Sequence, residues 1–90
     1  MKFRIKANVK PLKETTRKML DECIADILGG KFDDAMLDGT HVWRKVGGVE
    51  IFDSTTVKVI YGETKPETIT SLCAALSDYG CKLDSNYLKG

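Results

Sequence analysis

The sequence predicts an α+β fold in which two helices cover one face of an antiparallel sheet, with elements in the order β-α-β-β-β-α-β. Three patterns predict it. The chain opens with alternating apolar and polar residues, two later segments repeat apolar residues at three- and four-residue spacing, and a glycine pair separates two strand-like runs. Ninety residues leave room for one core, so we expect a single domain over residues 1–90.

The first strand is expected over residues 2–10. Its apolar residues occupy alternate positions, which is typical of a strand with one face on a core and the other in water. The inward set is Phe3, Ile5, Ala7 and Val9. Pro11 ends the strand because it has no N–H to donate.

A helix is expected over residues 13–28, ended by Gly29 and Gly30. Its apolar stripe consists of Thr16, Met19, Leu20, Cys23, Ile24, Ile27 and Leu28. The bases of this helix lie early and its acids late, which opposes the helix dipole. Helix stability therefore does not explain Lys13, Arg17 and Lys18.

For residues 31–39 the sequence does not distinguish a short helical turn from a loop. A hairpin follows, with strands over residues 41–46 and 49–53 joined by Gly47 and Gly48, a pair suited to a tight primed turn. A two-residue loop fixes the register: Val46 faces Val49, Lys45 faces Glu50, Arg44 faces Ile51 and Trp43 faces Phe52. Another strand, over residues 55–61, places Val57, Val59 and Tyr61 on one face.

The second helix begins with the segment Thr64 to Glu67, which fits a capping box with Pro66 in the first turn. Its buried stripe is Ile69, Leu72, Cys73, Leu76 and Tyr79, and Gly80 ends it. A last strand is expected over residues 81–87. Right-handed crossovers place both helices on the same side of the sheet. The order resembles a ferredoxin-like plait with an extra or bent hairpin strand, a likeness that covers most of the chain and concerns element order only.

Charge is unevenly distributed along the chain. The first twenty positions hold seven bases and one acid, and the remaining residues hold seven bases and twelve acids, which gives the net charge of +1. No apolar run is long enough to cross a bilayer, and Lys2, Arg4 and Lys6 interrupt any signal-peptide core. We therefore expect a cytoplasmic protein that does not enter membranes, with its three cysteines reduced.

The sequence carries no catalytic signature. His41 is the single histidine, no nucleophile motif accompanies it, and the glycine pairs lack the phosphate-loop pattern. Asp33, Asp34 and Asp38 do not match calcium-loop spacing. We expect a protein that is not an enzyme and that uses no cofactor or metal.

The function predicted by elimination is stoichiometric binding of a protein partner. Exposed Trp and Arg are frequent interface anchors, and a polarised charge pattern steers a complementary partner. The expected contact residues are Lys2, Arg4, Lys6, Lys13, Arg17, Trp43 and Phe52. In size and character the chain resembles small inhibitors carried by phages and other mobile elements, including anti-defence proteins.

Two alternatives remain. Bases beside aromatics on an open sheet are similar to RNA-recognition modules that bind single strands, although residues 45–52 lack that family's aromatic positions and Glu50 would repel phosphate. The segment from Val57 to Leu83 resembles the strand-turn-helix of small-molecule-sensing plait domains, which usually have a glycine where Glu67 follows Pro66.

Overall fold

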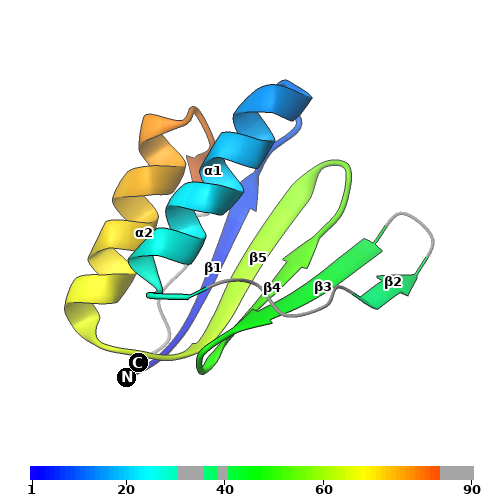
Figure 1. Ribbon diagram of the computed structural model, residues 1–90. Helices are drawn as coiled ribbons and strands as arrows, with labels where there is room; N and C mark the ends of the chain where they lie inside the picture. Colours follow the sequence, from blue (N-terminus) through cyan, green and yellow to red (C-terminus); the bar gives the residue numbers. More distant parts are fainter. Residues whose placement is uncertain (31–35, 39–40, 84–90) are drawn as a thin grey trace.

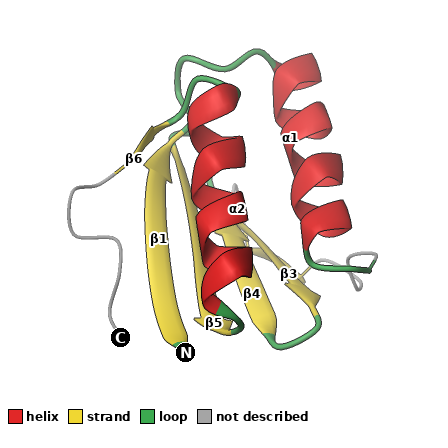
Figure 2. Ribbon diagram, turned by 90° about the vertical axis from the view of Figure 1, so that its left-hand side faces the viewer, coloured by secondary structure: helices red, strands yellow, loops and turns green. Residues whose placement is uncertain are grey.

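The computed structural model describes residues 1–30, 36–38 and 41–83, with side-chain surroundings for residues 1–30 and 44–83. Within these residues the strands are β1 (Lys2–Asn8), β2 (Met36–Asp38), β3 (His41–Val46), β4 (Val49–Asp53), β5 (Val57–Glu63) and β6 (Lys82–Leu83), and the helices are α1 (Glu14–Ile27) and α2 (Pro66–Asp78). The strands form one antiparallel sheet in the order β2-β3-β4-β5-β1-β6. Both helices lie side by side on one face of it (Figure 1, Figure 2). The predicted α+β class is confirmed.

β1 has the alternation that the sequence predicts. Its odd positions are buried beneath the helices and its even positions are exposed on the other side of the sheet. The strand ends two residues before the predicted limit. There the Lys10 N–H donates to Asn8 Oδ1 over 3.0 Å, and Pro11 follows.

α1 extends to within one residue of its predicted ends, and its buried residues are Leu20 and Ile24. Gly29 follows the helix with a φ of 77°, a conformation that favours glycine. α1 packs against α2 and, with it, covers the sheet.

α2 begins at Pro66, but the predicted capping box is wrong. The N-cap residue is Lys65, and it makes no side-chain cap hydrogen bond. Thr64 instead pairs with the chain terminus: its N–H donates to the Met1 carbonyl, and the Met1 amino group donates to the Thr64 carbonyl, each over 3.0 Å. This pairing fixes the start of α2 beside the start of β1.

The hairpin of β3 and β4 is confirmed together with its register, including the pairing of Trp43 with Phe52. Gly47 has a φ of 59°, and Gly48 is not among the glycines with positive φ, which fits a type II′ turn. The side chain of Trp43 lies outside the described residues.

β2 is an addition to the predicted element order. It pairs with β3 from Met36 to Asp38. The sequence did not decide between a helical turn and a loop for this stretch, and it did not predict a strand there. The predicted last strand is described only over β6, because its later residues lie outside the described range.

The core lies between the two helices and the sheet. Its fully buried large side chains are Ile5, Val9, Leu20, Ile24, Ile51, Ile60, Leu72 and Leu76. Cys81 is buried, Cys23 and Cys73 are half-buried, and all three are free thiols, as predicted.

Candidate functional site

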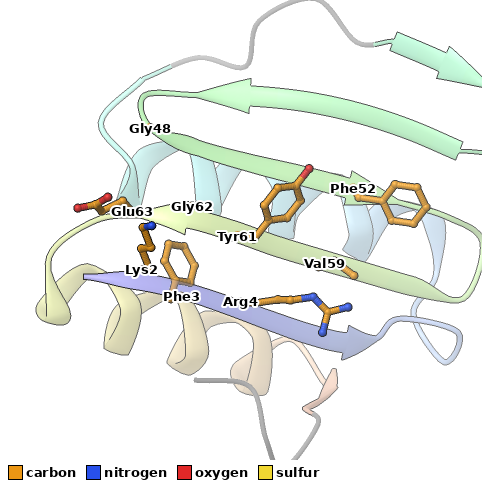
Figure 3. A pocket seen from close by; sticks show the side chains of 9 residues that line it. All are labelled: Lys2, Phe3, Arg4, Gly48, Phe52, Val59, Tyr61, Gly62 and Glu63. Carbon is orange, nitrogen blue, oxygen red and sulfur yellow. The ribbon is translucent and has the colours of Figure 1, made fainter. Parts of the chain in front are cut away.

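The face of the sheet opposite the helices carries the candidate site, and we call it the open face. It consists of the outward residues Lys2, Arg4, Lys6, Glu50, Phe52, Val59 and Tyr61, contributed by β1, β4 and β5. Figure 3 shows Arg4, Phe52, Val59 and Tyr61 on this face, together with Lys2. Each of them alternates with a residue that is directed toward the helices. Strand alternation therefore positions the whole set.

One cross-strand row of the open face is polar. Backbone pairing places Arg4 beside Tyr61, Tyr61 beside Glu50, and Glu50 beside Lys45. Lys45 Nζ lies 3.3 Å from Glu50 Oε1. Hydrogen bonding with the Tyr61 hydroxyl, and next with Lys45, lowers the pKa of Glu50. Burial, and next the Glu50 carboxylate, raises the pKa of Tyr61. Tyr61 is therefore held as a neutral hydroxyl beside an ionised Glu50.

The neighbouring row is apolar at its centre. Lys6 pairs with Val59 and Val59 pairs with Phe52, and both apolar side chains are half-buried. With Tyr61 they line a shallow hollow of about 780 Å³, whose rim includes Lys2, Arg4 and Glu63. The centre of the open face is thus apolar, and its rim carries charges of both signs.

Gly62 shapes one end of this hollow. Its φ is 143°, and a Cβ atom at this position would collide with the Gly48 carbonyl oxygen. The backbone of β5 therefore passes directly against the turn between β3 and β4, an approach that only glycine permits.

The structure separates the predicted contact residues into two groups. Lys2, Arg4, Lys6 and Phe52 share the open face. Lys13 is exposed at the N-cap of α1, away from that face. The side-chain placement of Trp43 lies outside the described residues, and its backbone pairs with Phe52.

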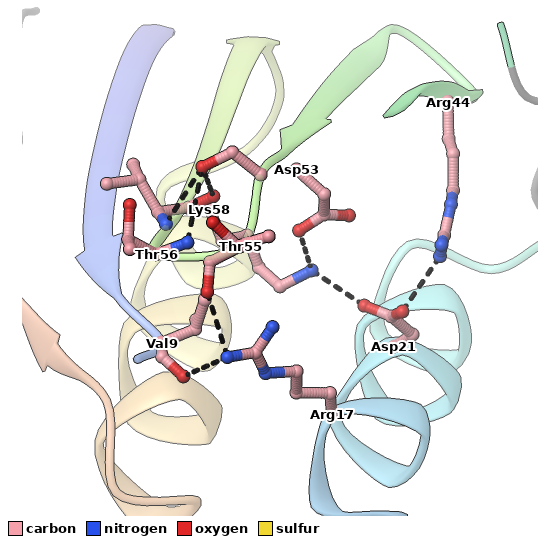
Figure 4. A network of polar contacts seen from close by, with 10 residues as sticks. Val9, Arg17, Asp21, Arg44, Asp53, Thr55, Thr56 and Lys58 are labelled. Carbon is pink, nitrogen blue, oxygen red and sulfur yellow. Dashed lines mark hydrogen bonds and ion pairs between the residues drawn. The ribbon is translucent and has the colours of Figure 1, made fainter. Parts of the chain in front are cut away.

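Arg17 belongs to the helix side of the sheet. Its Nη2 donates to the carbonyls of Val9 and Thr55, over 3.0 and 2.9 Å (Figure 4). One guanidinium therefore joins the end of β1 to the loop between β4 and β5. This contact gives a structural reason for a base early in α1, where the helix dipole disfavours it.

A second set of charges, the ionic cluster, consists of Asp21, Arg44, Asp53 and Lys58 (Figure 4). Lys58 Nζ lies 2.7 Å from Asp21 Oδ1 and 2.6 Å from Asp53 Oδ1, and Arg44 Nη1 lies 2.8 Å from Asp21 Oδ2. The Lys58 side chain is only 3% exposed. The cluster is electrically balanced and ties α1 to β3, β4 and β5.

Sequence reasoning missed Val59, Tyr61 and the ionic cluster. The alternation of Val57, Val59 and Tyr61 was visible, but an alternating strand does not show which of its faces the helices cover. The register settles it, because Lys58 and Ile60 pair with Ala7 and Ile5 on the helix side. The apolar stripe of β5 consequently lies on the open face.

Within the described part of the chain, no group of three or more potential metal ligands comes together. Neither described helix is long and apolar enough to cross a membrane. Comparison with protein-family models, with curated proteins and with solved structures finds no match.

Proposed function

We propose that this protein is a non-enzymatic binding protein that engages one protein partner stoichiometrically through the open face. The observation that carries the proposal is the arrangement of that face: Phe52, Val59 and Tyr61 at an apolar centre, within a charged rim. An apolar centre inside a polar rim is the usual anatomy of a protein–protein interface. Inhibition by occupying the partner's surface is part of this proposal.

The fold makes the face available. We infer that β6-β1-β5-β4 and the two helices form a ferredoxin-like plait, to which β3 and β2 are added at one edge. In such a plait the helices cover one side of the sheet. Among the described elements, none covers the side that carries Arg4 and Tyr61.

The charges favour a protein partner over a polyanion. Glu50 lies within the open face between Lys45 and Tyr61, and Glu63 lies on its rim. A phosphate backbone would meet these carboxylates unfavourably, whereas a protein surface can supply charges of both signs.

The test is quantitative partner capture from nuclease-treated lysate of the native cells. We expect Arg4→Glu and Val59→Glu, both on the open face, to reduce recovery of the partner by about tenfold or more, because truncating or reversing a central contact costs on the order of 2 kcal/mol. Lys65→Glu, at the exposed N-cap of α2, is the matched charge reversal on the helix side and should recover the partner as the native protein does. Equal recovery by all four proteins would refute the proposal.

Single-strand binding is a second candidate because of one specific observation. Lys6, Lys10 and Lys82 line a hollow beside Asn8 and Val57, next to the apolar row of the open face. Three lysines so placed could neutralise about three phosphates, and binding would then weaken steeply as salt increases. A salt titration with single-stranded RNA and DNA tests it. No binding at low salt, or binding that Lys6→Glu leaves unchanged, removes this candidate.

A further inference from the structure

The bases of the open face form a line along one margin of its apolar centre. Lys2, Arg4 and Lys6 are exposed and follow β1 at every second residue. Successive side chains on one face of a strand lie about 6.8 Å apart, so the three bases are evenly spaced. The apolar centre begins directly beside this line, because β5 is the neighbour of β1 (Figure 3).

The opposite margin of the apolar centre carries a charge pair that is satisfied within the protein. Glu50 of β4 accepts a hydrogen bond from the Tyr61 hydroxyl, and its Oε1 lies 3.3 Å from Lys45 Nζ. A partner that covers the apolar centre therefore meets exposed positive charge along β1 and a compensated pair along β4. Charge complementarity consequently calls for carboxylates on one flank of the partner only.

The open face offers side chains, not backbone groups, to a partner. β5 pairs with β1 on one side and with β4 on the other, and β4 also pairs with β3. Because the hydrogen bonds of a sheet run between its strands, a single extended segment placed over this face would bury its own N–H and C=O groups without partners. An α-helix bonds its backbone internally, so it can cover the face with side chains alone.

One helix also fits the width of the apolar centre. From β1 to β4 the sheet extends over two strand spacings, or about 9.6 Å. A helix with its side chains is about 10 Å across. A partner sheet is broader and would bury the pair of Lys45 and Glu50, whose side chains are 65% and 38% exposed, at a cost in desolvation.

We propose that the partner binds through an amphipathic α-helix that lies along the strands of the open face, with carboxylates at four-residue spacing on the flank over β1. The inference rests on the proposed function and names the binding element of the partner. Four residues of a helix rise about 6 Å, close to the interval of about 6.8 Å between the bases of β1. The apolar stripe of the helix then lies over Phe52 and Val59, which is recognition of a helix in a groove.

The first experiment uses isotope-labelled full-length protein and a capped helical peptide with one leucine stripe and three Glu residues at four-residue spacing on one flank. We expect chemical-shift changes at the amides of Arg4, Val59 and Tyr61. A matched peptide with Lys in place of Glu should bind at least about tenfold more weakly. A proline in the middle of the Glu peptide breaks its helix and should abolish binding.

The flank that carries the acids should determine the direction of the bound helix. A helix turned end for end on the same face exchanges its flanks, so a second peptide with Glu on the other flank meets the bases only when it runs the opposite way. A nitroxide at the peptide N-terminus should therefore broaden amides near Lys2 with one peptide and near Asn8 with the other. Broadening at the same end by both peptides would refute the proposed arrangement.

A charge exchange tests the contact itself. Arg4→Glu should weaken binding of the Glu peptide by about tenfold and strengthen binding of the Lys peptide, whereas Lys65→Glu, at the N-cap of α2, should change neither. Equal losses for both peptides would overturn the inference, as would unchanged binding of the proline peptide or the same shifts with a single-stranded oligonucleotide. A partner that is captured through Val59, while the helical peptides fail to bind, would refute the acidic helix and leave the proposed function standing.

Discussion

Gly62 is the residue at which a single methyl group would disturb the site most. Its φ of 143° is unfavourable for any residue with a side chain, and a Cβ atom would also collide with the Gly48 carbonyl. We expect Gly62→Ala to lower the free energy of unfolding by roughly 2–4 kcal/mol, since backbone strain alone costs on the order of 1–3 kcal/mol. Urea denaturation followed by circular dichroism measures the change.

Gly30→Ala is the control for this prediction. Gly30 has no positive φ, and a Cβ atom there would meet the Val46 side chain at 3.4 Å, an ordinary contact distance. We expect a change within about 0.5–1 kcal/mol. If the two alanine variants are equally stable, the close approach of β5 to the hairpin turn does not exist in solution.

At the scale of elements, the ionic cluster connects α1 to three strands of the sheet through its ion pairs. Lys58 is buried between Asp21 of α1 and Asp53 of β4. We expect Lys58→Met to lower the free energy of unfolding by about 3–5 kcal/mol, because it removes the buried cation and takes from Asp53 its ion-pair partner, whereas Asp21 keeps Arg44. Urea unfolding at pH 7 checks it.

Lys45→Met provides the comparison for Lys58→Met. Lys45 is 65% exposed and also pairs with a carboxylate, that of Glu50, so its replacement should change the free energy of unfolding by no more than about 1 kcal/mol. Similar losses in the two variants would show that burial of Lys58 does not control the stability of the cluster.

The elements that the sequence predicted well are those with local signals. Alternation predicted β1, the glycine pair predicted the β3–β4 register, and helical spacing predicted α1 to within one residue at each end. The partners of Asp21 were not predictable in this way, because Arg44 and Lys58 reach it from strands far along the chain. β2 also lacked a local signal, since its three residues are defined by pairing with β3.

The same limit applies to the candidate site. The basic row of β1 and the pairing of Phe52 followed from alternation and turn length. Placing Val59 and Tyr61 beside them required knowing that β5 lies between β1 and β4, which is a property of the assembled sheet. In β5, Lys58 is buried on the helix side and Val59 lies on the open face. This is the reverse of the placement that the polarity of the two side chains suggests.

At the scale of the molecule, the basic residues near the start of the chain lie on both sides of the sheet. Lys2, Arg4 and Lys6 project onto the open face, whereas Arg17 is used internally to join β1 to the loop before β5. The charge asymmetry of the sequence is thus only partly displayed on the open face. The part displayed there is the row of Lys2, Arg4 and Lys6, which belongs to the surface that we propose for binding.

The whole fold should lose stability in alkaline solution. Burial raises the pKa of the Cys81 thiol, and burial and Glu50 raise the pKa of Tyr61. Between the unfolded and folded pKa values the native state binds more protons than the unfolded state, so the free energy of unfolding falls as pH rises. The contribution is fully present below about pH 8.5 for the thiol and about pH 10 for the phenol, and it is lost above those values.

The double variant Cys81→Ala, Tyr61→Phe tests this origin. We expect the free energy of unfolding of the native protein to decrease between pH 8 and pH 11, and the decrease to be smaller in the variant, because neither replacement residue titrates. Urea unfolding across this range supplies the comparison, and the difference in tyrosinate absorbance between the two proteins reports the phenol of Tyr61 apart from Tyr79 and Tyr87. Parallel curves for the two proteins would assign the alkaline loss to groups other than Cys81 and Tyr61.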